Sequence, residues 1–281
     1  MLAIIGGTGL YQLAGLQVAD TVRPETPFGL PSSAILRGTV GGQPLLFLAR
    51  HGEQHQHLPS EINYRANIFA LKSLGATHVA GVSAVGSLRE SIAPGQIAVP
   101  NQYFDWTRGR RAASFFGDGV AAHVSTAHPV SAHLVDWIAS HAARLGIMLH
   151  LGVTYACVEG PRFGTQAESH FLRQAGCDLV GMTNVPEAFL AREAQLAYAT
   201  IAIATDYDCW LEDPDQHVTV DAILTRYRDS LALVLRLLAT LAAEPLPAIE
   251  GSIRQALAMA MMTPESALSD DQRAWIEVLR K

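Results

Sequence analysis

Short apolar runs alternate with amphipathic stretches along most of this chain. Runs of this length that are apolar at successive positions are typical of strands buried on both faces of a sheet. Because stretches with helical spacing separate them, we predict an α/β layered domain with a central mixed β-sheet flanked by helices. The predicted strands are 2–5, 45–49, 78–82, 97–99, 152–158, 179–182 and 199–204.

Three stretches predict helices from their spacing or from their first residues. Apolar residues recur at helical spacing over 62–74. Thr165 and Glu168 have the spacing of a capping box, in which a hydroxyl and a carboxylate each bond to a backbone N–H group, so a helix should begin there. Asn184 should cap a further helix, because the next residue but one is a proline, which is favoured in the first turn.

Two prolines interrupt the helical pattern near the end of the chain. A long helix is predicted over about residues 220–242, and Pro245 and Pro247 follow it. We therefore expect a main domain at 1–244 and a C-terminal helical extension at 245–281. Apolar residues of the extension recur at helical spacing, which favours packing against a core or an interface.

The composition predicts a well-packed protein with apolar surface to spare. Of 281 residues, 49% are hydrophobic and 16% are charged, and the formal net charge is −6. So low a charged fraction, against roughly 25% in an average globular chain, excludes disorder over most of the length and suggests a subunit interface. The acidic balance disfavours nucleic acid as a partner.

Cysteine usage and the apolar stretches bear on the compartment. Three cysteines without a CxxC pair are atypical of a disulfide framework or of a thiolate metal site. The N-terminus lacks the basic residues of a signal peptide, and the apolar stretch 231–243 is short and interrupted by Arg236. We therefore expect a cytoplasmic protein with no membrane partner.

Groups that bind oxyanions follow several of the predicted strands. Thr8 lies in a glycine-rich turn after the first strand, and Arg50 and His51 directly follow the second. Ser83 and Thr183 come at the ends of two others. Because α/β sheets bind ligands at the carboxyl ends of their strands, these donors predict an anion site at one edge. Plain turns without a ligand are the alternative for the glycine-rich and hydroxyl-bearing segments.

His55 and His57 are the residues that most resemble a metal-binding pair. No carboxylate or cysteine accompanies them at the spacing of a metal site. We interpret both as solvated loop residues and predict that the protein holds no metal.

Two carboxylates stand at the end of the last predicted strand. Asp206 and Asp208 follow the apolar run 199–204 and are two residues apart. If the strand stays extended, both side chains point the same way, and two like charges this close favour retention of a proton by one of them. The pair would then present a hydrogen-bond donor beside an acceptor. The alternative is a solvated loop with two independent aspartates.

Nine short motifs occur in order at residues 6–10, 26–29, 49–52, 63–67, 86–89, 159–163, 167–168, 182–187 and 204–210. Together they resemble the methylthioadenosine phosphorylase branch of the trimeric purine nucleoside phosphorylase family, over about residues 2–224. The resemblance implies a nucleoside phosphorylase fold, a catalytic domain at 1–244 and a homotrimer.

The resemblance further implies a pentosyltransferase of purine and methionine salvage. Inorganic phosphate attacks C1′ of 5′-methylthioadenosine, and adenine and 5-methylthioribose 1-phosphate are released. Phosphate is a co-substrate, and no cofactor is implied. Three alternatives stay open: phosphorolysis of a 6-oxopurine nucleoside such as methylthioinosine or inosine, hydrolysis of a nucleoside by water, and purine-nucleoside binding without catalysis.

The family's positions imply roles for individual residues. Phosphate is bound at positions matching Thr8, Arg50, His51, Ser83, Ala84 and Thr183. The nucleoside is bound at positions matching Phe163, Met182, Asp206 and Asp208, with His123 supplied by a neighbouring subunit and Val220 and Leu224 lining the slot for the 5′ substituent. For the last two, ordinary helix packing is the alternative. Because the departing purine becomes anionic, a neutral Asp206 would donate to N7 while ionised Asp208 accepts from the 6-amino group.

This sequence departs from the family pattern at two positions. Gly164 stands where a serine usually follows the phenylalanine, and Gly181 where an asparagine often precedes the methionine. Both changes remove a side chain that can form hydrogen bonds, so we expect a larger pocket and altered base and ribose contacts. Relatives that use 6-oxopurines carry an amide in place of Asp206, so the carboxylates here favour a 6-amino substrate.

Overall fold

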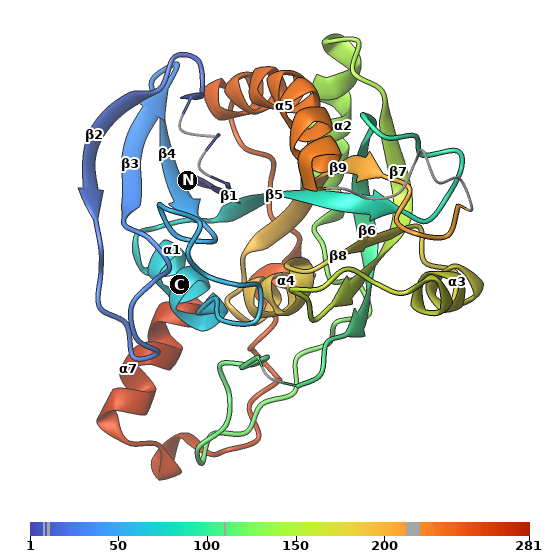
Figure 1. Ribbon diagram of the computed structural model, residues 1–281. Helices are drawn as coiled ribbons and strands as arrows, with labels where there is room; N and C mark the ends of the chain where they lie inside the picture. Colours follow the sequence, from blue (N-terminus) through green and yellow to red (C-terminus); the bar gives the residue numbers. More distant parts are fainter. Residues whose placement is uncertain (8, 10–11, 110, 212–219) are drawn as a thin grey trace.

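The computed structural model describes residues 1–7, 9, 12–109, 111–211 and 220–281, with the backbone alone over 220–229 (Figure 1). The described strands are β1 (Leu2–Gly6), β2 (Gln17–Val22), β3 (Ile35–Val40), β4 (Gln43–Ala49), β5 (His78–Ser87), β6 (Ile97–Trp106), β7 (Leu149–Val158), β8 (Leu179–Gly181) and β9 (Ala197–Asp206). The described helices are α1 (Tyr64–Ser73), α2 (Ala132–Arg144), α3 (Gln166–Gln174), α4 (Asn184–Glu193), α5 (Val220–Ala243), α6 (Gly251–Arg254), the 3-10 helix η3 (Glu265–Ala267) and α7 (Asp270–Arg280).

The predicted mixed sheet is confirmed, and each of the seven predicted strands is present. The strand order is β2-β3-β4-β1-β5-β8-β7-β6-β9, with β1 parallel to both β4 and β5. The apolar pattern missed β2 and β3, which pair antiparallel at one edge. β2 is exposed along most of its length, so it carries no buried face that an apolar pattern could reveal.

β5 organises the sheet because it pairs with three other strands. It lies parallel to β1 and β9 and antiparallel to β8. The pairings β5–β8–β7–β6–β9–β5 therefore close into a ring of strands. The second half of β5 contacts the ends of both β8 and β9, which brings three segments that bear predicted site residues to one place.

Helices cover both faces of the sheet, as the doubly apolar strands require (Figure 1). The core on one face includes residues of α1, α4 and α7, and the core on the other includes residues of α2 and α5. Along β1, Ile5 packs in the first core and Ile4 in the second. This is the period-two alternation of a strand that is buried on both sides.

The C-terminal tail packs onto the first core. Trp275 of α7 is buried there with residues of α1 and α4. An isolated β-bridge pairs Ala122 with Met261, and the His123 N–H donates a hydrogen bond to the Ala260 carbonyl. The tail thus holds the segment that bears His123. A boundary between 244 and 245 stays a prediction.

The Glu193 carboxylate, at the end of α4, holds the loop that leads to His123. It accepts hydrogen bonds from the Ser114 hydroxyl and the Phe115 N–H, both at 2.8 Å. Burial raises the pKa of Glu193 to about 7, although these two hydrogen bonds act in the opposite direction. The folded protein therefore binds this proton more tightly than the unfolded chain does.

We expect the stability that this protonated carboxyl contributes to be complete below pH 4.5 and to be lost as the pH rises through about 7. Glu193→Gln cannot ionise, so it should lose less stability than the wild type over this window. Thermal unfolding midpoints of both proteins, measured between about pH 5 and pH 8, test this. Midpoint curves that run parallel would contradict it.

Candidate active site

The two predicted helix starts have different outcomes. Thr165 and Glu168 form the expected capping box at the start of α3, which is confirmed. The prediction of Asn184 as a cap is wrong, because α4 has Thr183 at its N-cap position with no side-chain cap bond. The Asn184 side chain instead reaches into the core, and Val185 after it has non-helical angles of φ −114° and ψ 126°.

Arg50, directly after β4, is buried in an ion pair with Glu187 of α4. Its side chain is 2% exposed, and its Nε and Nη2 donate to the two Glu187 oxygens at 2.6 and 2.8 Å. Nη1 donates to the Val82 carbonyl at 2.8 Å, and Nη2 also donates to the Ile5 carbonyl at 3.3 Å. Burial opposes the charge of Arg50, but attraction by Glu187 outweighs it and raises the pKa of the guanidinium.

These hydrogen bonds limit the number of N–H groups with which Arg50 can bind an anion. From the sequence we expected the Arg50 guanidinium to bind an oxyanion, but in the folded protein its Nε and Nη2 hold the Glu187 carboxylate. Four of the five guanidinium N–H groups are committed to protein atoms, which leaves one on Nη1 for a ligand.

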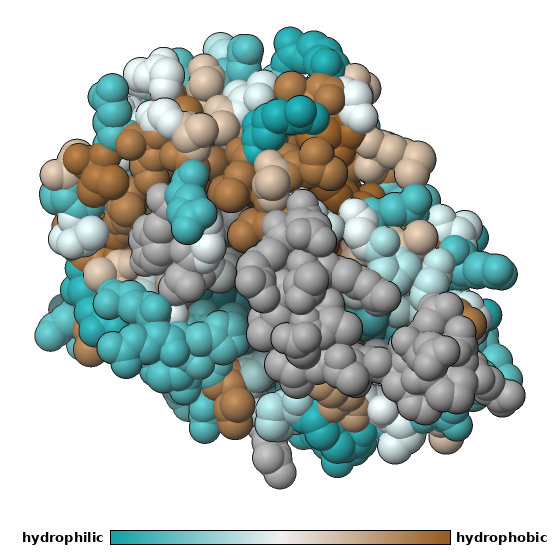
Figure 2. Space-filling view, turned by 45° about the horizontal axis from the view of Figure 1, so that its top comes forward, coloured by the Kyte–Doolittle hydropathy of each residue, from teal (hydrophilic) through white to brown (hydrophobic). Residues whose placement is uncertain are grey.

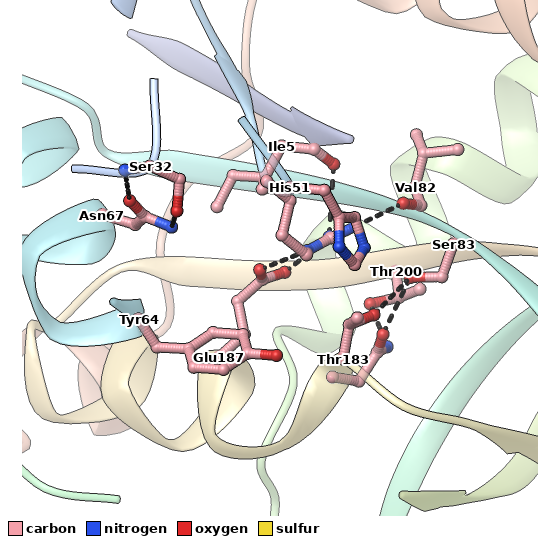
Figure 3. Close-up of polar contacts among 12 residues, drawn as sticks. Ile5, Ser32, His51, Tyr64, Asn67, Val82, Ser83, Thr183, Glu187 and Thr200 are labelled. Atoms are coloured by element: carbon pink, nitrogen blue, oxygen red, sulfur yellow. Dashed lines mark hydrogen bonds and ion pairs between the residues drawn. The ribbon is translucent and has the colours of Figure 1, made fainter. Parts of the chain in front are cut away.

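Ser83 of β5 and Thr183 meet at the same place as predicted, although 100 residues separate them. Their hydroxyl oxygens lie 3.4 Å apart, and both side chains are buried (Figure 3). The Ser83 hydroxyl also donates to the Asn184 Oδ1 at 2.9 Å. Ala84 follows in β5 and is exposed, whereas Val85 after it is buried again.

His51 is a neutral residue beside Arg50. Its Nδ1 lies 2.9 Å from the His57 carbonyl, which can only accept, so Nδ1 carries the hydrogen and Nε2 is an acceptor. Burial lowers the pKa of His51 to about 4, and the positive charge of Arg50 acts in the same direction. The His51 ring also stacks on His55 at 4.5 Å between centroids.

Asp206 and Asp208 come together by a bulge and a turn rather than along an extended strand. Ala204 of β9 pairs with Val85, and Asp206 pairs with Gly86, so Thr205 is an extra residue. Asp208 has a left-handed φ of 53°, so the condition that the strand stays extended through Asp208 is not met. The Asp208 N–H donates to the Asp206 Oδ1 at 2.7 Å, which fixes the turn.

The surroundings of Asp206 leave little room and supply polar partners. The side chain is 7% exposed, and the Thr205 hydroxyl lies 2.7 Å from its Oδ2. A Cβ at Gly86 would lie 3.0 Å from the Asp206 Oδ1 and 3.2 Å from the Asp208 Cβ. Glycine at position 86 therefore lets the two-aspartate turn approach β5 closely.

A cavity of about 130 Å³ adjoins the second carboxylate. Asp208, Gly164 and Glu168 are among its lining residues. A Cβ at Gly164 would come no nearer than 3.9 Å to the Glu168 Oε2 and 4.0 Å to the Asp208 Oδ2. The expectation of extra space at Gly164 is therefore in agreement with the structure. Phe163, the residue before it, is 48% exposed.

The expectation of extra space at Gly181 is wrong. A Cβ at this position would lie 2.0 Å from the Tyr155 hydroxyl oxygen. The phenol of Tyr155 thus occupies the volume that a larger residue would need, and the Thr183 N–H donates to the same oxygen at 3.5 Å. Glycine at 181 accommodates a buried tyrosine rather than enlarging the pocket.

Met182 is held in place through its backbone. The Arg111 Nη1 donates to the carbonyls of Met182 and Val185, both at 2.7 Å. The same guanidinium donates to the Glu159 carbonyl at 2.8 Å and pairs with the Glu159 carboxylate at 3.2 Å. Arg111 therefore ties the turn that bears Met182 and Thr183 to the end of β7.

Four predicted site residues lie where the structure gives little or nothing. Thr8 lies outside the described residues, as do the side chains of Val220 and Leu224. His123 is exposed on the segment that the tail holds, and the described part of the chain records no contact between it and the residues above.

Neither a metal-ligating cluster nor a membrane-spanning helix is found among the described residues. Within residues 1–7, 9, 12–109, 111–211 and 220–281, there is no cluster of three or more potential metal-ligating side chains, and His55 and His57 belong to none. Over the same ranges, no helix has the length and apolarity needed to cross a bilayer.

Buried polar residues that hold the site together were missed at the level of sequence. Glu187 was part of a motif, but its role as the partner of Arg50 was not predicted. Tyr198 and Thr200 lie in or next to an apolar run that was interpreted only as a buried strand. A tyrosine and a threonine in such a strand could have signalled a buried hydrogen-bond network.

Residues 1–240 match the family described as the Phosphorylase superfamily. The chain is 49% identical to the S-methyl-5′-thioadenosine phosphorylase of Geobacter sulfurreducens, over 83% of this chain and 81% of that protein. It is 49% identical to the enzyme of the same name from Rhodospirillum rubrum, over 90% and 87%.

Solved structures of the same kind resemble this fold. A methylthioadenosine phosphorylase from an Antarctic soil metagenomic library superposes with a TM-score of 0.88 at 41% identity, over 99% of this chain and 98% of that one. The methylthioadenosine phosphorylase of Schistosoma mansoni in complex with adenine gives a TM-score of 0.83 at 35% identity, over 95% and 99%.

Proposed function

The chain belongs to the phosphorylase superfamily, and we propose that it catalyses the phosphorolysis of 5′-methylthioadenosine to adenine and 5-methylthioribose 1-phosphate. It is a nucleoside phosphorylase, a pentosyltransferase that acts on a small nucleoside and inorganic phosphate.

The observation that best supports this function is that β5 passes two groups of predicted site residues, one near each end of its second half. Ser83 contacts Thr183, and Val82 before it accepts from Arg50, at what would be the anion end. Gly86 adjoins Asp206 and Asp208 at what would be the carboxylate end. At about 3.3 Å per residue, three residues of strand separate the two ends by about 10 Å. This separation leaves room for a ribose between a phosphate and a purine.

At the anion end, the phosphate would be bound by Thr8, Arg50, His51, Ser83, Ala84 and Thr183. Arg50 supplies one N–H and a positive charge, and the hydroxyl of Thr183 stands at the N-terminus of α4, where the helix dipole favours an anion. The bound phosphate would place negative charge below the sugar and stabilise the cationic ribose of the transition state.

At the carboxylate end, Asp206 would act as the catalytic acid that donates to N7 of the departing purine. Asp208 would accept from the 6-amino group, because its carboxylate borders the 130 Å³ cavity. Met182 would lie beneath the ribose and Phe163 beside the sugar and base. The exposed Phe163 ring would then be covered by the substrate.

The slot for the 5′ substituent would be completed by Val220 and Leu224 and by His123 of a neighbouring subunit in a homotrimer. Figure 2 shows apolar residues gathered in a band across the upper part of one face. Phe104 and Phe171 are 37% and 49% exposed, and each packs edge-to-face on Trp106. Apolar surface of this kind supports association between subunits.

The compartment, the absence of a cofactor and the domain boundary are part of the same proposal. The protein would act in the cytoplasm with no cofactor, since phosphate is its co-substrate. The catalytic domain would span 1–244, and the extension 245–281 would hold the segment that bears His123.

The test is adenine release in the presence and absence of phosphate. We expect rapid release of adenine from methylthioadenosine, with 5-methylthioribose 1-phosphate as the second product, and loss of activity in phosphate-free buffer. Undiminished activity without phosphate would identify a hydrolase. Comparison with adenosine, methylthioinosine and inosine separates 6-amino from 6-oxo substrates, and saturable nucleoside binding without any product would identify a non-catalytic binder.

A further inference from the structure

A continuous chain of buried hydrogen bonds joins the Arg50–Glu187 ion pair to Ser83. Its direction can be worked out because a carboxylate paired with a guanidinium only accepts hydrogen bonds. The Tyr198 hydroxyl donates to the Glu187 Oε1 at 2.8 Å. That hydroxyl has a single hydrogen, so its oxygen accepts from the Thr200 hydroxyl, 2.9 Å away. Burial raises the pKa of the Tyr198 phenol, so the phenol keeps its hydrogen.

The chain continues from Thr200 to Ser83 through Asn184. Because Thr200 spends its hydrogen on Tyr198, its Oγ1 accepts from the Asn184 Nδ2 at 2.6 Å and from the Tyr103 hydroxyl at 3.4 Å. The NH₂ group of Asn184 therefore faces Thr200, and its oxygen faces Ser83 at 2.9 Å. An amide oxygen only accepts, so Ser83 donates its one hydrogen to Asn184.

Glycine at position 81 keeps open the space in which the chain runs. A Cβ there would lie 2.8 Å from the Tyr198 hydroxyl oxygen and 3.2 Å from both the Glu187 Oε1 and the Thr200 Oγ1. Gly81 has no left-handed φ in the structure. Its small size, and not its backbone freedom, is what this position requires.

We propose that Ser83 meets the bound anion as a hydrogen-bond acceptor, and that the site thereby selects phosphate over sulfate. This inference rests on the proposed function, which places phosphate at Ser83. Near neutral pH, inorganic phosphate carries at least one hydrogen that it can donate to Ser83, whereas sulfate carries none. A bound sulfate would set its oxygen against the lone pairs of the Ser83 oxygen.

The other groups at the anion end have donor and acceptor roles that agree with this assignment. The remaining N–H of Arg50 is a donor for the unprotonated oxygens of phosphate. Because Ser83 donates to Asn184, the Thr183 hydroxyl is the donor in its 3.4 Å contact with Ser83, and it can turn this hydrogen to a phosphate oxygen instead. His51 carries its hydrogen on Nδ1, toward the His57 carbonyl, so its Nε2 adds a second acceptor and no donor. A hydrogen on the phosphate therefore has an acceptor. The hydrogen-bond chain on the core side keeps the hydrogen of the Ser83 hydroxyl directed at Asn184.

The first experiment measures anion binding without nucleoside, by calorimetry, with phosphate, sulfate, arsenate and selenate. Arsenate, like phosphate, carries a hydrogen near neutral pH, and selenate, like sulfate, carries none. Both anions are larger than the first two. We expect wild-type protein to bind phosphate and arsenate roughly 10- to 100-fold more tightly than sulfate and selenate. Equal affinities for the two classes would overturn the inference.

Ser83→Ala distinguishes an acceptor from a donor. An acceptor at Ser83 bonds only to the hydrogen-bearing anions, so the variant should lose roughly tenfold in phosphate affinity while sulfate affinity stays the same or improves. A donor at Ser83 would bond to both anions. Equal weakening of phosphate and sulfate by Ser83→Ala would therefore refute the proposal.

Tyr198→Phe tests the buried chain at a residue that does not touch the anion. Without the Tyr198 hydroxyl, Thr200 can donate to Asn184, the amide can reverse, and the hydrogen of Ser83 is released toward the anion. We expect sulfate to bind several-fold more tightly and the preference for phosphate to fall. The matched control is Tyr64→Phe, which removes a buried hydroxyl that donates to the Pro59 carbonyl and accepts from the Arg111 Nη1 at 3.4 Å, both outside this chain of hydrogen bonds. Tyr64→Phe should keep the wild-type preference, and a Tyr198→Phe protein that keeps it too would refute the proposal.

The outcomes separate this inference from the proposed function. Selective phosphate binding in a protein that releases no adenine from methylthioadenosine would leave the inference standing and overturn the function. Phosphate-dependent adenine release by a protein that binds sulfate as well as phosphate would support the function and overturn the inference.

Discussion

Asp206→Asn is expected to lower kcat for methylthioadenosine by a factor of about 10² to 10⁴, with a much smaller change in KM. An amide can still form a hydrogen bond to N7 of the purine, but it has no proton to give up as the glycosidic bond breaks. The loss should therefore fall on the transition state and not on substrate binding.

The structure indicates why this variant should fold. The carbonyl of the introduced amide can accept from the Asp208 N–H, which in the wild type donates to the Asp206 Oδ1 at 2.7 Å. The new NH₂ group can donate to the Thr205 hydroxyl, which can in turn donate to the Val85 carbonyl at 3.2 Å. The polar groups in these bonds keep their partners, so the free energy of unfolding should change little.

The measurement is steady-state kinetics of adenine release at saturating phosphate, with thermal unfolding as a check on folding. Asp178→Asn is the matched control, because the Asp178 carboxylate likewise accepts a hydrogen bond from a backbone N–H, that of Thr154, at 2.7 Å. The control should keep nearly normal turnover. If Asp206→Asn also turns over within about threefold of wild type, Asp206 is not the catalytic acid. We further expect the variant to lose less activity toward inosine-type than toward adenosine-type substrates.

Glu187→Ala is expected to destabilise the fold by about 3–5 kcal/mol and to abolish phosphate-dependent turnover. The Arg50 and Glu187 side chains are 2% and 1% exposed, so removal of the carboxylate leaves a buried guanidinium without its counter-charge. The same change frees the Tyr198 hydroxyl from its acceptor and removes the fixed direction of the chain to Ser83.

Urea unfolding and phosphate titrations of activity measure the two parts of this effect. Asp20→Ala breaks an ion pair with Arg37 in which both side chains are 45% exposed and screened by water, so it should cost far less stability than Glu187→Ala. The double variant Arg50→Met with Glu187→Leu removes both charges. It should regain most of the lost stability while activity stays absent, because apolar side chains satisfy the core but cannot bind phosphate. A Glu187→Ala protein as stable and active as the Asp20→Ala control would contradict the role of the pair.

Local sequence patterns were sufficient to predict much of the fold. Runs such as 199–204 predict strands because burial on both faces requires apolar residues at successive positions, a property visible in a few residues. The capping box at Thr165 and Glu168 is equally local and was predicted correctly. β2 was missed because an exposed edge strand imposes no such pattern.

The sequence by itself also located the candidate chemistry, since Arg50, Ser83, Thr183 and Asp206 all follow or end apolar runs. It did not determine their partners. Arg50 pairs with a residue 137 positions away, and Gly181 is small because Tyr155 comes from another strand. A buried polar group must be satisfied by whatever the folded chain brings beside it, and a residue's own neighbours in sequence do not specify that. The apolar pattern determined the layers and the edge at which donors gather, whereas the tertiary structure alone decided which hydrogen bonds each donor makes and in which direction they run.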